Sequence, residues 1–117
     1  MNTEATELKL FIDNDAELYR RMAIPIYRNQ VTKMARGLWN PTLSVKGFKY
    51  LVDAGAKEYV RAHCGRNVRV RDVFDSKTRW EVAQHLSEDF LVEAVLGNYN
   101  ELLPKKYKGK GFVTCTK

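Results

Sequence analysis

The chain has few of the residues that build metal sites, disulfide scaffolds or nucleophilic centres. Its 117 residues include two cysteines, Cys64 and Cys115, and two histidines, His63 and His85. Two cysteines are too few for a disulfide framework, and a reducing compartment would keep both as thiols. His63 and Cys64 are neighbours, so on a helix their side chains point about 100° apart and cannot converge. We therefore predict no metal, no cofactor and no enzymatic activity, although His85 on a neighbouring helix could still serve Cys64 as a base.

Long apolar runs and phosphate-loop patterns are also missing. No apolar stretch approaches the ~18 residues of a membrane span, and the sequence starts with acids where a signal peptide has basic residues. Neither G-x-x-x-x-G-K-[ST] nor G-x-G-x-x-G occurs. We expect a soluble, cytoplasmic protein that does not enter a membrane. Its length and its 44% hydrophobic content suit one compact domain, which we place at residues 1–104, followed by a basic flexible tail at 105–117.

The clearest predicted element is an amphipathic helix that starts at Asn40-Pro41 and ends near Cys64-Gly65. Asparagine caps a first turn well, proline is favoured at the first helical position, and glycine adopts the left-handed conformation that ends a helix. Gly55 and Ala56 lie in its apolar stripe, where their small size would let another helix approach closely. We predict a helix packing site there.

A second helix is predicted between Thr78 and Leu96. Thr78-x-x-Glu81 matches a capping box, and Gly97 stands where a helix would stop. Trp80 and Val95 fall on or beside its apolar face, while the exposed remainder is acidic. The acids of this helix are Glu81, Glu88, Asp89 and Glu93.

The N-terminal third keeps helical spacing but contains Pro25, which predicts a kink or break near Ile24. Asp15 suits a helix start and Gly37 a helix stop. Residues 7–12 could form a short strand or extend the helix backward, and the spacing favours helix. Arg66 to Arg71 alternates like a strand but has no partner strand, so we expect an extended connector.

These elements predict an all-α, small single-domain bundle of three to four helices, with its first helix kinked near Pro25. Its predicted core residues share helical spacing and apolar side chains. They are Met22, Ile26, Val31, Met34, Phe48, Leu51, Val52, Tyr59, Trp80, Leu86, Phe90 and Leu91.

Charge is sorted along the chain. Residues 16–79 carry 14 Lys and Arg against 5 Asp and Glu, whereas residues 80–104 carry 5 acids and no Lys or Arg. The basic block would attract phosphates or an acidic protein surface, and the acidic helix could neutralise it from within. Three basic groups have few acids nearby. They are the group Arg20, Arg21, Arg28, Lys33 and Arg36; the group Arg61, Arg66, Arg69 and Arg71; and the tail lysines Lys105, Lys106, Lys108 and Lys110.

The charge pattern leaves two functional classes open. As a nucleic-acid-binding protein, the chain would contact phosphates through Arg61, Arg66, Arg69, Arg71 and the four tail lysines. Tyr107 and Phe112 in the tail could stack on unpaired bases or dock back on the domain. If the acidic helix instead covers the arginines, in the same molecule or in a second copy, we expect a module that binds and inhibits or modulates a host protein.

A resemblance supports a setting but no activity. The residues that carry it are Asn14-Asp15, Leu18-Tyr19, Pro25-Ile26, Asn29, Lys33, Gly37, Phe48-x-Tyr50-Leu51-Val52, Gly55-Ala56-Lys57, Tyr59, Gly97-Asn98-Tyr99 and Leu102 to Tyr107. Across roughly residues 7–108, the chain resembles a group of short uncharacterised proteins of bacteriophages and mobile elements. The resemblance implies a small accessory protein in a bacterial host cell, and it brings no site residues with it.

Overall fold

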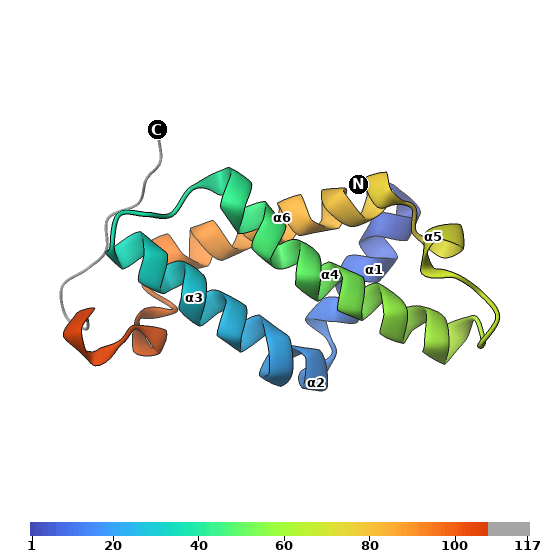
Figure 1. Ribbon diagram of the computed structural model, residues 1–117, viewed down its shortest axis with the longest axis horizontal. Coiled ribbons are helices and arrows are strands. Elements are labelled where there is room, and N and C mark those ends of the chain that lie inside the picture. Colours follow the sequence, from blue (N-terminus) through green and yellow to red (C-terminus); the bar gives the residue numbers. More distant parts are fainter. Residues whose placement is uncertain (108–117) are drawn as a thin grey trace.

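Helices supply the secondary structure of residues 1–107, the part of the chain that the computed structural model describes (Figure 1). In chain order they are α1 (Thr3–Asp13), α2 (Ala16–Leu18), the π-helical η1 (Tyr19–Ala23), α3 (Ile24–Ala35), α4 (Pro41–His63), α5 (Val70–Val73), α6 (Ser76–Val95), and the 3₁₀ turns η2 (Asn100–Leu102) and η3 (Lys105–Tyr107). No strand occurs among these residues, so the all-α prediction is confirmed.

Side-chain caps fix where the helices of the first half begin. The Asp15 carboxylate accepts a hydrogen bond from the Leu18 N–H at 3.0 Å, and the Asn40 side chain accepts one from the Leu43 N–H at 2.9 Å. Both predicted starts are confirmed. Residues 7–12 are helical but belong to the separate helix α1, because Asp15 starts a new helix instead of continuing the first one.

Pro25 stands in the first turn of α3, directly after the π-helical stretch η1. Proline has no N–H to donate to the carbonyl four residues earlier, and a π turn departs from that same bonding pattern. The chain is helical from Ala16 to Ala35 across this point. A bend near Pro25 stays a prediction.

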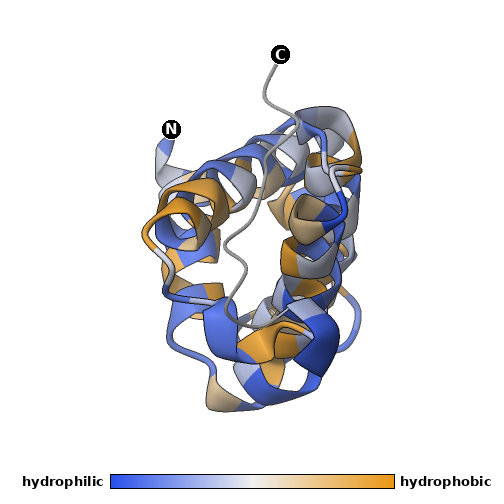
Figure 2. Cartoon of the chain, turned by 90° about the vertical axis from the view of Figure 1, so that its left-hand side faces the viewer, coloured by the Kyte–Doolittle hydropathy of each residue, from blue (hydrophilic) through white to orange (hydrophobic). Residues whose placement is uncertain are grey.

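The core forms where α1, α4 and α6 meet. Helix α4 packs along α6, and α1 contacts both of them. A Cβ atom added to Gly55 on α4 would lie 2.4 Å from Ile12 Cγ1 on α1, so the predicted close contact is confirmed, with α1 as the partner. Viewed along the long axis, the helices carry apolar and polar segments in alternation, as expected for helices with one buried face (Figure 2).

Helix α6 ends as predicted but starts earlier. Gly97 follows its last turn with φ +87°, the left-handed conformation that favours glycine. At the other end the cap is Asp75, whose carboxylate accepts the Thr78 N–H at 2.8 Å. The capping box at Thr78 was therefore wrong. Thr78 instead lies in the first turn and is 6% exposed.

The connector between α4 and α6 is partly helical. Val70–Val73 forms the single turn α5, so the extended conformation predicted for Arg66 to Arg71 is wrong at its end. Phe74 follows this turn and is buried, which fixes the connector to the core as expected. Val70 and Val73 are partly buried beside it.

Most predicted core residues are buried or pack against the core, with one exception. Trp80 is 41% exposed, because it lines an open cleft between α4 and α6 instead of the core. Val95 on the same helix is 62% exposed, although the pattern placed it at the edge of the apolar face. Trp39, which was not predicted, is buried.

The chain after α6 folds back onto the core. Tyr99 stacks on Tyr27 with ring centroids 4.6 Å apart, and Leu103 is buried. Tyr107 in η3 packs against the core, and the boundary at residue 104 stays a prediction. The rest of the predicted tail, from Lys108 onward, lies outside the described residues. Within residues 1–107, none of the helices combines the length and the apolar character that crossing a membrane requires.

Candidate nucleic-acid interface

A cleft lined by cations lies where α4 ends. Gly65 follows the helix with φ +90° and turns the chain back, so residues after it lie beside the last turns of α4. The cleft has a volume of about 280 Å³. We call it the arginine cleft; it is lined by Lys57, Val60, Arg61, Gly65, Arg66, Val68 and Val70. Two of the predicted contact residues, Arg61 and Arg66, are thus brought together, and Lys57 joins them.

The cations of this end of the molecule are largely uncompensated. The Arg61 guanidinium lies 3.8 Å from the Glu58 carboxylate, too far for a hydrogen bond, and its side chain is 69% exposed. Within residues 1–107, Lys57 and Arg66 form no ion pair. Arg69 and Arg71 flank and enter α5, are exposed, and likewise have no carboxylate partner among the described residues. Such cations can neutralise phosphates without first breaking internal contacts.

The solvent face of α4 extends this positive surface. Lys46, Tyr50, Asp53, Lys57 and Arg61 follow one another at steps of three or four, so they share one side of the helix. Asp53 is the acid of this row. Helix α4 has 23 residues, so the row is about 22 Å long from Lys46 to Arg61 at 1.5 Å per residue.

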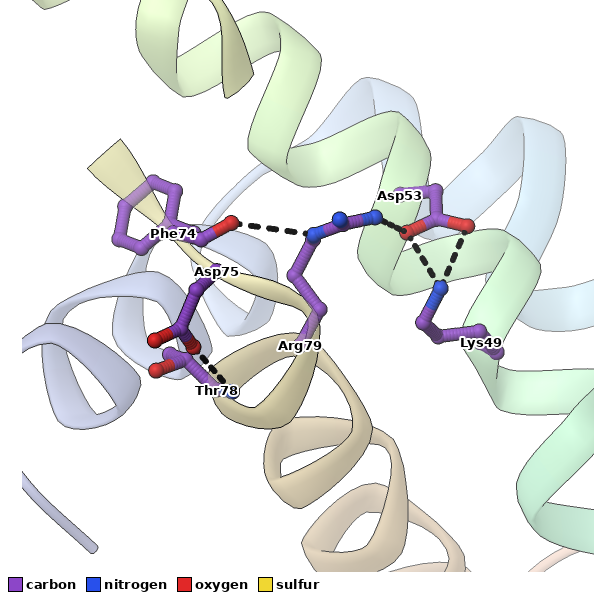
Figure 3. A network of polar contacts seen from close by, with 6 residues as sticks. All are labelled: Lys49, Asp53, Phe74, Asp75, Thr78 and Arg79. Carbon is purple, nitrogen blue, oxygen red and sulfur yellow. Dashed lines mark hydrogen bonds and ion pairs between the residues drawn. The ribbon is translucent and has the colours of Figure 1, made fainter. Parts of the chain in front are cut away.

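Asp53 does not cancel this charge, because two cations already share it (Figure 3). The Lys49 ammonium lies 2.9 Å from Asp53 Oδ1, and the Arg79 guanidinium reaches the same oxygen from α6 at 2.9 Å. Arg79 also donates from Nε to the Phe74 carbonyl at 3.1 Å. The network ties the start of α6 and the end of the connector to α4, and it leaves the cluster with a net positive charge.

The two groups of predicted contact residues lie at opposite ends of the molecule. The C-terminal end of α4 and α5 lie at the right-hand end of Figure 1, while η3, which contains Lys105 and Lys106, lies at the left-hand end. Lys105 and Lys106 are exposed, and the Lys106 ammonium lies 5.1 Å from the Tyr107 ring centroid. Lys108, Lys110 and Phe112 lie outside the described residues. The described cations therefore form two surfaces rather than one.

The acidic helix does not cover the arginines of its own molecule in the described residues. Asp89 pairs with Lys9 at 2.9 Å, and Glu88 lies 3.7 Å from His85 on its own helix. Glu93 accepts a hydrogen bond from Asn98. The ion pairs with Asp89 and Asp13 raise the pKa of Lys9 against the opposing effect of its burial. Internal quenching of the cluster Arg61, Arg66, Arg69 and Arg71 is therefore not seen.

Of the other basic group, Arg20 is hydrogen-bonded to Glu17, while Arg21 lies 3.8 Å from the same carboxylate, as far as Arg61 lies from Glu58. Both approach the Glu17 carboxylate, one turn earlier in the same helical segment. Lys33 lines a second cleft, of about 300 Å³, between α3 and α4. Tyr50 from α4 lines the same cleft and is 73% exposed.

A third and larger cleft runs between α4 and α6, with a volume of about 500 Å³. We call it the tryptophan cleft; it is lined by Trp39, Pro41, Thr42, Val45, Lys46, Trp80, Gln84, Ser87, Glu88 and Leu91. Its floor is fixed by a buried polar network. Gln30 accepts hydrogen bonds from Trp39 Nε1 at 2.9 Å and from the Ser44 hydroxyl at 2.5 Å, and Ser44 contacts Ser87 at 2.6 Å.

Three residues that line the clefts described above were not predicted as site residues. Lys57 was not among the predicted contact residues, and the Asp53 carboxylate four residues earlier is paired with Lys49 and with Arg79 from α6. The spacing of four residues between Lys57 and Arg61 was the available signal. Trp80 had been assigned to the core, and Tyr50 had been given no role beyond the resemblance. Their exposure depends on how α4 and α6 pack against each other, and the spacing of apolar residues within one helix does not predict that packing.

The residues considered for catalysis or metal binding do not cluster. His63 packs against the Tyr59 ring at the end of α4, with centroids 4.7 Å apart, while His85 lies in α6 beside Glu88. Within residues 1–107, no group of three His, Cys, Asp or Glu side chains could hold a metal ion. Cys115 lies outside these residues.

No protein-family model, curated protein or solved structure matches this chain.

Proposed function

We propose that this protein is a small non-enzymatic accessory protein of a phage or mobile element that binds nucleic acid. Its main contact would be the arginine cleft together with Arg69 and Arg71, and Lys105, Lys106, Lys108 and Lys110 would add a second contact at the other end of the molecule. The observation that carries the proposal is the convergence of Lys57, Arg61 and Arg66 on one cleft, where Glu58, 3.8 Å from Arg61, is the one carboxylate that approaches them within residues 1–107.

The physical argument is electrostatic. Each phosphate that a lysine or arginine neutralises releases condensed counterions, which supplies much of the affinity and makes binding strongly salt dependent. Contacts of this kind position a nucleic acid without reading its sequence. The formal net charge of +6 acts in the same direction by attracting polyanions from solution.

The test is a mobility-shift titration at two salt concentrations with matched charge variants. Arg61→Gln combined with Arg66→Gln removes two cations from the cleft, whereas Arg20→Gln combined with Arg21→Gln removes two cations that share Glu17. We expect the first pair to weaken binding and to flatten the slope of log affinity against log salt by about 0.7 to 0.9 per lost contact. The changes at Arg20 and Arg21 should affect the affinity and the salt slope much less.

Two results would overturn the proposal. Equal weakening by both pairs would mean that only net charge matters and that the cleft is no site. No shift of any probe at low salt would remove nucleic-acid binding altogether. The favoured function would then be the alternative, a module that binds a host protein. Its binding surface would be the apolar walls of the tryptophan cleft.

A further inference from the structure

Two aromatic rings flank the positive face of α4 and are left in solvent. Trp80 is 41% exposed and Tyr50 is 73% exposed. Trp80 forms a wall of the tryptophan cleft on the α6 side of α4, and Tyr50 lines the cleft on the α3 side. Lys46 lies between them, because it precedes Tyr50 by one turn and lines the same cleft as Trp80.

Trp80 has a cation beside its ring, and Tyr50 shares its cleft with another cation. The Lys49 ammonium lies 4.8 Å from the centroid of the Trp80 ring, where the Asp53 carboxylate also holds it. Lys33 lines the same cleft as Tyr50. Cations alongside accessible rings are the combination with which proteins bind single strands, since the cations contact phosphates while the rings stack on unpaired bases. In a duplex the bases are stacked inside the helix, so its phosphates would contact the cations while its bases could not stack on the two rings.

We infer that the ligand is a single-stranded nucleic acid that lies along the solvent face of α4, with its phosphates on Lys46, Lys57, Arg61 and Arg66 and with bases stacked on Trp80 and Tyr50. This inference rests on the proposed function and names its ligand class. Glu88 on the α6 wall of the tryptophan cleft repels phosphates, so the backbone stays on the α4 side and a base enters the cleft. The apolar side chains of Val45 and Leu91 line the space that the base would enter.

The experiment compares a dT oligomer of about 20 nucleotides with its duplex, because a site of this kind covers several nucleotides and tolerates any base. Binding to the full chain is followed by fluorescence anisotropy of labelled DNA and, separately, by tryptophan emission. We expect the single strand to bind at least about tenfold more tightly than the duplex. The emission should be quenched by the single strand, and Trp80→Phe should remove most of that quenching, because Trp39 is 2% exposed.

The variants separate stacking from charge. Trp80→Ala and Tyr50→Ala should each weaken single-strand binding by about tenfold to a hundredfold, the effect expected for one lost stacked base, and should leave duplex binding unchanged. Trp80→Phe should restore most of the affinity, since phenylalanine keeps a stacking face. The control is Tyr19→Ala, which removes a ring that is 49% exposed on η1 and that lines neither the tryptophan cleft nor the cleft of Tyr50.

The outcomes distinguish the inference from the proposed function. Equal binding of the single strand and the duplex, with Trp80→Ala and Tyr50→Ala no weaker than Tyr19→Ala, would overturn the inference and leave phosphate binding intact. If neither DNA binds at low salt, the proposed function fails and the inference fails with it. If Trp80→Phe is as weak as Trp80→Ala, the indole is needed for something other than stacking, which also overturns the inference.

Discussion

Gly55 is the residue at which a single methyl group decides how two helices meet. An added Cβ would lie 2.4 Å from Cγ1 and 2.9 Å from Cδ1 of Ile12, so α1 would have to move away from α4. We expect Gly55→Ala to lower the free energy of unfolding by about 1 to 3 kcal/mol, as overpacking does, although alanine favours helix more than glycine. Urea unfolding measures this change.

The neighbouring side chain provides the control for Gly55. Ile12→Ala removes both atoms that the new methyl group would meet. In that background, Gly55→Ala should stabilise the protein by up to about 1 kcal/mol, because only the helix propensity then changes. The same loss in both backgrounds would show that Ile12 is not the obstacle.

Gln30 is the residue that makes the buried polar network possible. Gln30 is 4% exposed. Its side-chain oxygen accepts hydrogen bonds from Trp39 and from the Ser44 hydroxyl, and its side-chain nitrogen donates to the Ser44 carbonyl at 3.2 Å. Gln30→Leu would leave the Trp39 N–H and the Ser44 hydroxyl without this partner. We expect a loss of about 1 to 3 kcal/mol in thermal or urea unfolding, the cost of unpaired buried polar groups. A stability equal to that of the native chain would show that water or Ser87 replaces the amide.

At the scale of elements, most helix boundaries can be predicted from the sequence, because the residues at each helix end determine them. Asp15, Asn40, Gly65 and Gly97 all act where their residue types predict. The start of α6 was misplaced because Asp75 and Thr78 are both good caps, and the choice depends on which carboxyl or hydroxyl group meets the free N–H. Helical spacing likewise marks an apolar face without telling how much of it neighbours cover, so Trp80 was assigned to the core.

The cap of α6 makes one element sensitive to acid. The hydrogen bond from the Thr78 N–H lowers the pKa of the Asp75 carboxyl below its ordinary value of 3.8. The folded state therefore favours the carboxylate, so its stabilising effect is complete above that ordinary value and is lost as the pH falls through the lower, folded pKa. Asp75→Asn keeps an acceptor at the cap but cannot titrate.

Melting temperatures measured across acidic pH test this cap. Below about pH 4 the native chain should lose stability faster than Asp75→Asn, and at neutral pH Asp75→Ala should melt below both. Parallel pH curves for the native chain and Asp75→Asn would show that Asp75 contributes no pH dependence.

At the scale of the whole molecule, the positions of the cations predict how binding energies combine. The C-terminal end of α4, whose residues line the arginine cleft, and η3 lie at opposite ends of the long axis (Figure 1), so no single phosphate can bridge them. Tyr107 packs against the core, and removing residues 105–117 would therefore disturb the fold as well as the charge. Lysine-to-glutamine changes at Lys105, Lys106, Lys108 and Lys110 remove the charge and keep Tyr107 in the chain.

Because the arginine cleft shares no partner with Lys105 and Lys106 within residues 1–107, the free-energy cost of these four changes should add to that of Arg61→Gln with Arg66→Gln, within about 0.3 to 0.5 kcal/mol. Each set should also flatten the salt slope by about 0.7 to 0.9 per lost contact, and the combined variant should show the summed change. Affinities of the native chain, the two sets and their combination, measured at several salt concentrations, complete the cycle. If the combined variant binds as tightly as the weaker-binding of the two sets, both regions serve one contact. The distance between the two ends of the molecule argues against that result.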